Sequence, residues 1–311
     1  MTHVSARRGA VYVSVAATAW GTGGAAGSLL FETGGLGPVG VSLWRYLLGA
    51  AFLLLLANGR TAARTAARTA ARISGGARAA GGLGGHLNGR VLVVGAGMAV
   101  YQTAYFAAIA HSGVAVATVV TMGATPVFTA LGSRFLLRER LGRVALVALA
   151  VALAGLVLLT AETVAQARMS SVAGIAFALA SAAGYAGVTL YSRRHRDGDP
   201  QAMAIGGFVV GAACLAPFAL AEGVVPEVTW TSVALLVYLG AVPTALAYGL
   251  FFRALTALRA TTVSIISLGE AVGAALLGVV LFGERLTPLA WSGCVLLLAA
   301  VAVLAARAEA A

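Results

Sequence analysis

The sequence predicts an all-α integral membrane protein with ten transmembrane helices, arranged as two inverted five-helix repeats with the N- and C-termini in the cytoplasm. Three observations predict this fold class. The 311 residues are 60% hydrophobic and only 10% charged, whereas soluble proteins carry roughly 25% charged residues. Apolar runs long enough to cross a bilayer recur along the chain, and one pair of these runs occurs twice.

The apolar runs define the predicted helices in order. A helix that crosses the hydrocarbon core needs about 20 mainly apolar residues. The run that follows the first nine residues is longer than the apolar core of a cleaved signal peptide, so we interpret it as the first span. The ten predicted spans are 10–30, 37–57, 91–110, 113–133, 144–162, 171–191, 202–221, 232–252, 261–281 and 288–306.

The duplication is clearest in residues 105–141 and 250–286, which align so that Glu139-Arg140-Leu141 matches Glu284-Arg285-Leu286. Each copy consists of two apolar runs separated by a short polar break. Such internal similarity at a fixed spacing indicates a repeat architecture.

Similar apolar runs surround each copy, so we predict one repeat over residues 1–162 and a second over 171–306. Trp20 in span one and Tyr185 in span six occupy matching positions. Because each repeat holds an odd number of spans, the second enters the membrane with the opposite orientation, an arrangement that secondary transporters use for alternating access around a midplane site.

The basic residues predict the orientation. All 21 of them are arginine, and with a cytoplasmic N-terminus all but Arg45, Arg168 and Arg285 lie on the cytoplasmic side or in its loops. This distribution satisfies the positive-inside rule and requires an even number of spans. We therefore expect a multi-pass protein of the cell (cytoplasmic) membrane. The absence of lysine disfavours Schiff-base chemistry and a P-loop phosphate site.

The connection between spans two and three, residues 58–89, is rich in arginine and glycine and repeats the motif TAAR three times. As a helix it would carry a basic stripe able to lie against anionic lipid headgroups. The alternative, which we favour, is a low-complexity insertion with no role beyond its charge.

The motifs resemble those of the drug/metabolite transporter (DMT) superfamily, in its ten-span EamA-type branch. The residues that carry this resemblance are Trp20-Gly21, Pro38 followed by Arg45, Thr125-Pro126-Val127 through Glu139-Arg140-Leu141, and Glu270-Ala271-Val272 through Gly283-Glu284-Arg285-Leu286-Thr287. Together they extend over the chain apart from the insertion. The resemblance implies transport, but members of this family move solutes as different as amino acids, sugars, nucleotide-sugars and drugs.

The same resemblance implies a difference between spans four and nine. The family usually has proline where Ala271 stands. We therefore expect span nine to lack the bend that Pro126 gives to span four. We further expect Pro126 and Pro243 to act as hinges, because an intramembrane proline frees a backbone carbonyl, although structural kinking alone is an equal alternative.

Two charged residues lie deep within predicted spans. Glu270 is about 13 Å from the cytoplasmic start of span nine at 1.5 Å per residue, and an intramembrane carboxylate is a functional hypothesis by default. It binds a substrate amine or a coupling proton, or else it is a buried structural residue. Arg45 could attract an anionic group or form a charge pair with Glu270. The interpretation that we favour is that its side chain snorkels to the interface.

Aromatic and polar side chains at mid-depth complete the predicted cavity. Buried tyrosine and tryptophan need partners for their O–H and N–H groups, which a substrate or another helix supplies. The predicted substrate-binding or cavity residues are Trp20, Tyr101, Gln102, Tyr105, Tyr185, Tyr248 and Glu270.

The predicted function is efflux of small metabolites, such as amino acids or drug-like solutes, by alternating access. Proton coupling and facilitated diffusion are both compatible with the sequence. The alternatives are an importer or facilitator of a sugar-like or nucleotide-like solute and, least favoured, a membrane-embedded lipid-modifying enzyme, which would need clustered acids or histidines. We expect no enzyme activity, cofactor, metal or nucleic-acid partner, and either a monomer or a homodimer in the lipid bilayer.

Overall fold

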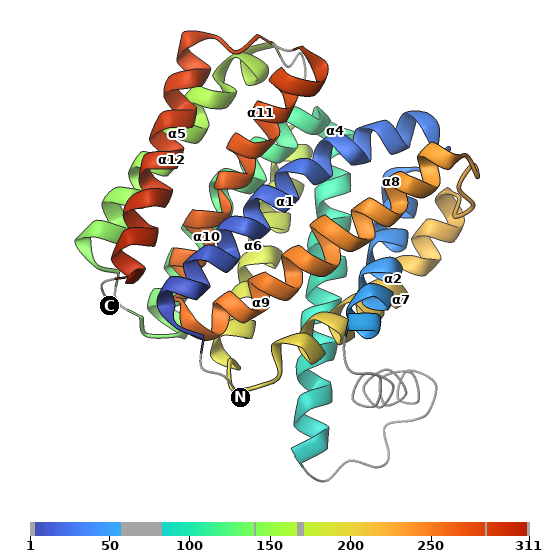
Figure 1. Ribbon diagram of the computed structural model, residues 1–311, viewed down its shortest axis with the longest axis horizontal. Helices are drawn as coiled ribbons and strands as arrows, with labels where there is room; N and C mark the ends of the chain where they lie inside the picture. Colours follow the sequence, from blue (N-terminus) through green and yellow to red (C-terminus); the bar gives the residue numbers. More distant parts are fainter. Residues whose placement is uncertain (1–3, 57–82, 140, 167–170, 284, 310–311) are drawn as a thin grey trace.

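The computed structural model describes residues 4–56, 83–139, 141–166, 171–283 and 285–309, which are almost entirely helical and contain no strand (Figure 1). Within them, nine helical segments are long and apolar enough to cross a membrane, and the 28-residue α1 (Ala6–Thr33) is a further long helix. The predicted all-α membrane architecture is therefore confirmed.

The remaining helices follow in chain order. They are α2 (Pro38–Leu56), α4 (Leu83–Leu136), α5 (Arg143–Gln166), α6 (Val172–Arg194), α7 (Pro200–Glu222), α8 (Trp230–Gly240), the π-helix η1 (Ala241–Leu246), α9 (Ala247–Ala257), α10 (Ala260–Ser267), α11 (Gly269–Phe282) and α12 (Pro288–Glu309). Most of the predicted insertion lies outside the described residues, but α4 begins at Leu83, so the end of the insertion belongs to a helix.

Local sequence explains where several helices begin. Ser5 and Ser171 accept hydrogen bonds from the backbone N–H groups of Arg8 and Gly174, which caps α1 and α6. Asp199 caps α7, and Pro200 occupies its first turn, where the missing N–H has no partner to lose.

Helix α4 contains spans three and four and folds back on itself. A straight helix of 54 residues would be about 80 Å long, far more than a bilayer. The hydroxyl groups of Tyr105 and Thr118 nevertheless lie 2.6 Å apart, although 13 residues of straight helix would separate them by about 20 Å. The chain thus reverses between these residues while keeping helical hydrogen bonding, and each limb crosses the membrane once.

Span eight is not a uniform α-helix. It runs from α8 through η1 into α9, and Pro243 lies in the π-helical segment. Proline has no backbone N–H and cannot complete an α-helical hydrogen bond. A π-helical segment inside a long helix is a frequent feature of functional sites.

Span nine is broken at Leu268, between α10 and α11, whereas α4 stays helical through Pro126. Span nine therefore has an irregularity, at Leu268, that the residue at position 271 did not indicate. The N–H groups of Leu268 and Ala271 bond to carbonyls three residues earlier, which tightens the turn.

The helices pack in matched pairs. Helices α2 and α7 lie side by side at one end of the molecule, α5 and α12 at the other, and the remaining helices fill the space between them (Figure 1). Helix α1 packs against α9 and α11 of the second half, while α6 packs against α4 of the first half. Each half therefore contributes its first helix to the other half.

A close glycine contact holds α5 against α12. A Cβ at Gly293 would lie 2.4 Å from the backbone nitrogen of Leu159 and 2.5 Å from the carbonyl oxygen of Gly155. Only glycine permits this approach. Small residues at helix interfaces are the usual means of tight packing in membranes.

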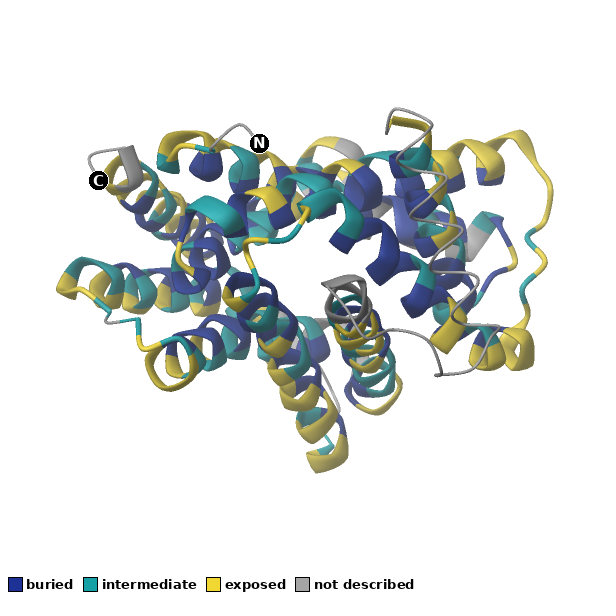
Figure 2. Ribbon diagram, turned by 90° about the horizontal axis from the view of Figure 1, so that it is seen from below, coloured by how far each residue is buried: buried dark blue, intermediate teal, exposed yellow. Residues whose placement is uncertain are grey.

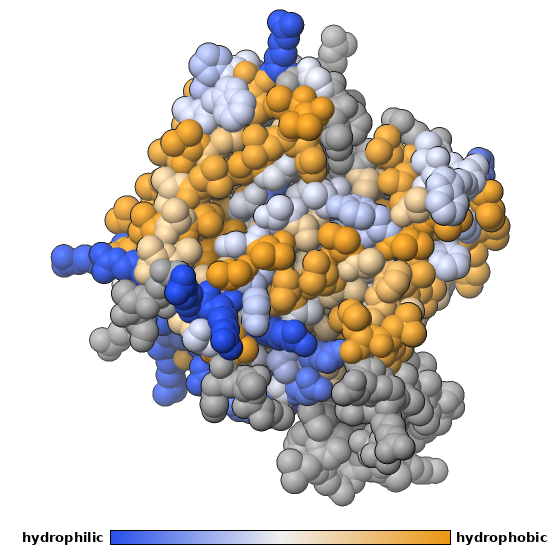
Figure 3. All heavy atoms as spheres, viewed as in Figure 1, coloured by the Kyte–Doolittle hydropathy of each residue, from blue (hydrophilic) through white to orange (hydrophobic). Residues whose placement is uncertain are grey.

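The exterior fits a lipid environment. Buried residues lie along the inner faces of the helices and exposed residues on the outside, as Figure 2 shows from below. The visible flank in Figure 3 is largely hydrophobic, and strongly hydrophilic residues gather at the lower end. Helix α1 begins and α12 ends at this same end (Figure 1). We call it the arginine-rich end, because the terminal turns found there contain Arg7, Arg193, Arg194 and Arg307.

Candidate functional site

An aromatic cluster occupies the middle of the bundle. The ring of Trp20 on α1 meets Tyr248 and Phe251 on α9 edge-on, with centroids 5.1 and 5.4 Å apart. The ring of Tyr185 on α6 meets Tyr101 on α4 edge-on at 5.3 Å. Trp20 and Tyr185 occupy matching positions in the two repeats, and each contacts a helix of the opposite half.

A hydrogen bond joins the two parts of this cluster. The hydroxyl groups of Tyr101 and Tyr248 lie 2.6 Å apart and are buried. This bond links α4 to α9, that is, span three to span eight. The cluster therefore ties helices of the two halves together in the middle of the bundle.

One donor in the cluster has no partner. Within the described residues, the buried Nε1 of Trp20 makes no hydrogen bond. Leaving a buried donor unsatisfied costs about 1–3 kcal/mol, so such a group calls for an explanation. A bound solute or water molecule at this position would accept the hydrogen bond.

Glu270 lies in the first turn of α11, immediately after the break in span nine. A carboxylate there interacts favourably with the helix macrodipole. Its backbone is fixed by α1, because a Cβ at Gly21 would lie 2.8 Å from the Glu270 carbonyl oxygen. Glu270 is partly exposed, and its carboxylate has no hydrogen-bond partner or salt bridge within the described residues.

Arg45 on α2 reaches the π-helical segment of span eight. Its Nε donates a hydrogen bond to Oγ1 of Thr244, at 3.3 Å, and the Thr244 hydroxyl donates to the carbonyl of Leu239, at 2.7 Å. The charges of Arg45 and Glu270 interact, but no direct salt bridge joins them in the described part of the chain.

The partly exposed polar residues lie near these charges. Gln102 donates from Nε2 to Oγ of Ser42 on α2, at 3.1 Å. The ring of Tyr105, whose hydroxyl bonds to Thr118, experiences the charges of both Glu270 and Arg45. The structure therefore brings together the predicted residues from both repeats: Trp20, Arg45, Tyr101, Gln102, Tyr105, Tyr185, Tyr248 and Glu270.

Sequence reasoning missed the hydroxyl groups that position these side chains. Ser42, Thr118 and Thr244 each bond to a predicted site residue. Thr244 follows Pro243 directly, so its proximity to a predicted hinge was a usable signal. Serine and threonine are too common in membrane helices for Ser42 and Thr118 to be distinguished in the same way.

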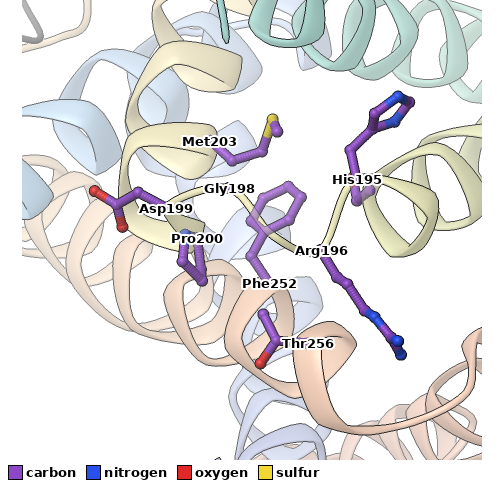
Figure 4. Close-up of a pocket in the computed structure, with 9 residues that line it drawn as sticks. His195, Arg196, Gly198, Asp199, Pro200, Met203, Phe252 and Thr256 are labelled. Carbon is purple, nitrogen blue, oxygen red and sulfur yellow. The ribbon is translucent and has the colours of Figure 1, made fainter. Parts of the chain in front are cut away.

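A small pocket opens at the arginine-rich end, between the connection from α6 to α7 and helix α9 (Figure 4). His195 and Asp199 line it from the connection, and Phe252 and Thr256 from α9. The ring of Phe252 also contacts Tyr248, with centroids 6.4 Å apart. Phe252 therefore separates this pocket from the aromatic cluster.

The fold and this site define a multi-pass membrane protein whose two halves enclose charged and aromatic side chains. Comparison with known proteins gives the family. The profile of the EamA-like transporter family matches twice, over residues 7–161 and 172–306. The chain belongs to the EamA-like transporter family, as its motifs indicated, and is a transporter rather than an enzyme.

Two known proteins illustrate the similarity. The "Uncharacterized transporter YwfM" of Bacillus subtilis (strain 168) is 32% identical over 210 residues, which is 67% of this chain and 70% of that protein. A solved crystal structure, 21% identical in sequence, superposes with a TM-score of 0.78 over 97% of each chain. At this identity the superposition shows the fold alone.

Proposed function

We propose that this protein exports small solutes across the cytoplasmic membrane by alternating access, with both termini in the cytoplasm. The observation that carries the proposal is the Glu270 carboxylate at a break in span nine. It is partly exposed, has no salt bridge among the described residues, and lies within the electrostatic influence of Arg45. Broken helices and unpaired charges at mid-depth are what secondary transporters use to bind solutes.

The arrangement suits a small solute with an amino group. Its ammonium would bind Glu270, a carboxylate on the same molecule would meet Arg45, and an apolar body would lie against the aromatic cluster. The N–H of Trp20, which lacks a partner in the described residues, would donate a hydrogen bond to the same molecule. Amino acids and amphipathic amines both meet this description.

The two halves would move relative to each other around this site. The π-helical segment at Pro243 and the break at Leu268 are the places where spans eight and nine depart from regular helix. Such points absorb the backbone changes of a hinge motion. A proton that occupies Glu270 in place of the solute would couple export to proton entry.

The test is counterflow in proteoliposomes with a panel of labelled amino acids and amines, comparing the wild type with Glu270→Gln. A charge-assisted hydrogen bond contributes about 1.5–3 kcal/mol, so we expect the variant to need about tenfold to a hundredfold more solute for half-maximal exchange.

The matched control is Glu222→Gln, because Glu222 accepts a hydrogen bond from the Gly40 N–H at a helix end and not from a mid-depth partner. It should leave the half-maximal concentration unchanged. Equal exchange by wild type and a folded Glu270→Gln variant would rule out Glu270 as the binding group. Stimulation by a pH gradient that the variant loses would assign the coupling proton to Glu270.

A further inference from the structure

A buried arginine joins three segments at the arginine-rich end. Arg193, in the last turn of α6, is only 8% exposed. Its Nη1 donates to the carbonyl oxygens of Leu255, at 2.9 Å, and Thr256, at 3.2 Å, in the last turn of α9. Its Nε donates to Oε1 of Glu139, at 3.2 Å, in the connection from α4 to α5. One side chain thus holds parts of both repeats together.

The interior is closed beside this contact. Ser133 on α4 and Thr261 on α10 are buried and share a hydrogen bond of 3.1 Å. Thr129 and Leu255 are likewise buried. In contrast, Glu270, Gln102 and Tyr105 are partly exposed. Buried residues therefore close the bundle beside the Arg193 contact, whereas these residues of the central site keep some exposure.

The contact is not fully satisfied. Within the described residues, Oε2 of Glu139 and Oγ of Ser192 are buried without a hydrogen-bond partner. A buried ion pair stabilises a structure only when its remaining polar atoms are also satisfied. This pair therefore gives the closed arrangement less net stability than a complete network would, which suits a contact that forms and breaks.

The backbone next to Glu139 is strained. Arg138 has a φ of 54°, in the left-handed region that a residue with a Cβ rarely adopts. The Glu139 N–H bonds back to the carbonyl of Ser133, at 3.0 Å, which fixes this turn. Strain of this kind concentrates at functional elements and switch regions.

The pocket of Figure 4 lies directly against this contact. Ser192 precedes Arg193 in the chain, and the Thr256 carbonyl accepts a hydrogen bond from Arg193. On its inner side Phe252 contacts Tyr248 of the central cluster. Separation of α9 from α6 would therefore extend the pocket towards the central site.

We propose that Arg193 and Glu139 form a latch that closes the central site towards the arginine-rich face. When the two side chains separate, the ends of α6 and α9 and the connection from α4 to α5 part, and the pocket becomes an entrance. This inference rests on the proposed transport function, in which the solute must reach the site from that face.

The test measures access to the interior and does not require a known solute. Ser264 is 3% exposed, on α10, and its hydroxyl has no partner in the described residues, so Ser264→Cys is a small change that places a reporter thiol below the latch. Cys214 is exposed and is replaced by alanine, while the buried native Cys294 stays as an internal control for unfolding. The reporter thiol is then labelled with a membrane-impermeant maleimide in vesicles oriented so that the arginine-rich face is outside.

The latch is then opened by Arg193→Gln or by Glu139→Gln in this background. Loss of a charge-assisted contact shifts a two-state equilibrium by about tenfold or more, so we expect reporter labelling to rise about tenfold with Cys294 still protected. Arg194→Gln is the matched control, because the neighbouring Arg194 is exposed and, among the described residues, bonds to the Leu136 carbonyl at 3.1 Å and to no carboxylate. It should not change the labelling.

Several results would overturn the latch. The first is unchanged labelling of the reporter in a folded Arg193→Gln or Glu139→Gln protein. The second is an equal rise in reporter labelling in Arg194→Gln, and the third is a rise in which Cys294 is labelled as well. If Arg193→Gln does not fold, Glu139→Gln decides, because it retains the Arg193 contacts with α9. Failure of wild-type counterflow, with latch-dependent labelling intact, would reject the transport proposal alone.

Discussion

At the scale of single residues, the centre of the molecule depends on polar atoms that satisfy one another across the two halves. The hydroxyl pair of Tyr101 and Tyr248 is one such link, at 2.6 Å. Both side chains are buried in an aromatic surrounding. Their contribution to stability therefore depends on both partners being present.

This dependence predicts a non-additive mutant cycle. Tyr101→Phe or Tyr248→Phe alone leaves a buried hydroxyl without its partner, which costs about 1–3 kcal/mol. The double variant removes both groups and should be more stable than the sum of the single effects implies. Thermal unfolding in detergent measures this, and additive single and double effects would show that the hydroxyl groups do not interact.

Residue-level sequence reasoning singles out residues whose chemistry is rare in a membrane helix and overlooks residues whose chemistry is common. Glu270 and Arg45 were found because charges are exceptional inside spans. The hydrogen bond from Arg193 to Glu139 was missed, because 54 residues separate the two and arginine near a span end is ordinary. The duplication contained a usable signal for the strained turn at Arg138. The matching residue in the second repeat is Gly283, and its φ is also positive, at 67°.

At the scale of helices, close packing depends on a few glycines. A Cβ at Gly293 would overlap the backbone of α5 at Gly155 and Leu159, with distances of 2.5 Å or less. Such atoms cannot move aside as a flexible side chain can. The pairing of α5 with α12 is consequently sensitive to a single methyl group.

We predict that Gly293→Ala destabilises the protein by about 1–3 kcal/mol, the usual cost of overpacking. Gly187→Ala on α6 is the control, because nothing lies within 4 Å of a Cβ at that position. It should be neutral or stabilising by up to about 1 kcal/mol, since alanine is the better helix former. Denaturation of both variants in the same detergent compares them, and equal stability would argue against the tight crossing.

The approximate helix boundaries were predictable because hydropathy determines them, and Pro243 indicated the irregular segment of span eight, whereas the break at Leu268 had no such signal. Proline at 126 and its absence at 271 suggested a bend in span four and none in span nine. The structure has a break at Leu268 in span nine, and α4 keeps its helical hydrogen bonding on both sides of Pro126. Neighbouring helices decide whether a membrane helix bends, and a single sequence does not reveal these neighbours.

At the scale of the whole molecule, the distribution of arginine predicts the orientation. The chain begins and ends at the end where hydrophilic residues gather (Figures 1 and 3). A reporter fused to the C-terminus should therefore be active as a cytoplasmic fluorescent protein and inactive as a phosphatase that needs the exterior. The opposite pattern would reverse the proposed orientation and place the latch on the outer face.

Helix α1 has a further consequence, for biosynthesis. It contacts α9 and α11 through small and hydroxyl-bearing residues, and it is not among the segments apolar enough to count as a span by hydropathy. The small and polar residues that let α1 pack closely against α9 and α11 thus also lower the hydropathy that directs a segment into the membrane. The final place of α1 in the bilayer therefore depends on α9 and α11, which are synthesised long after it.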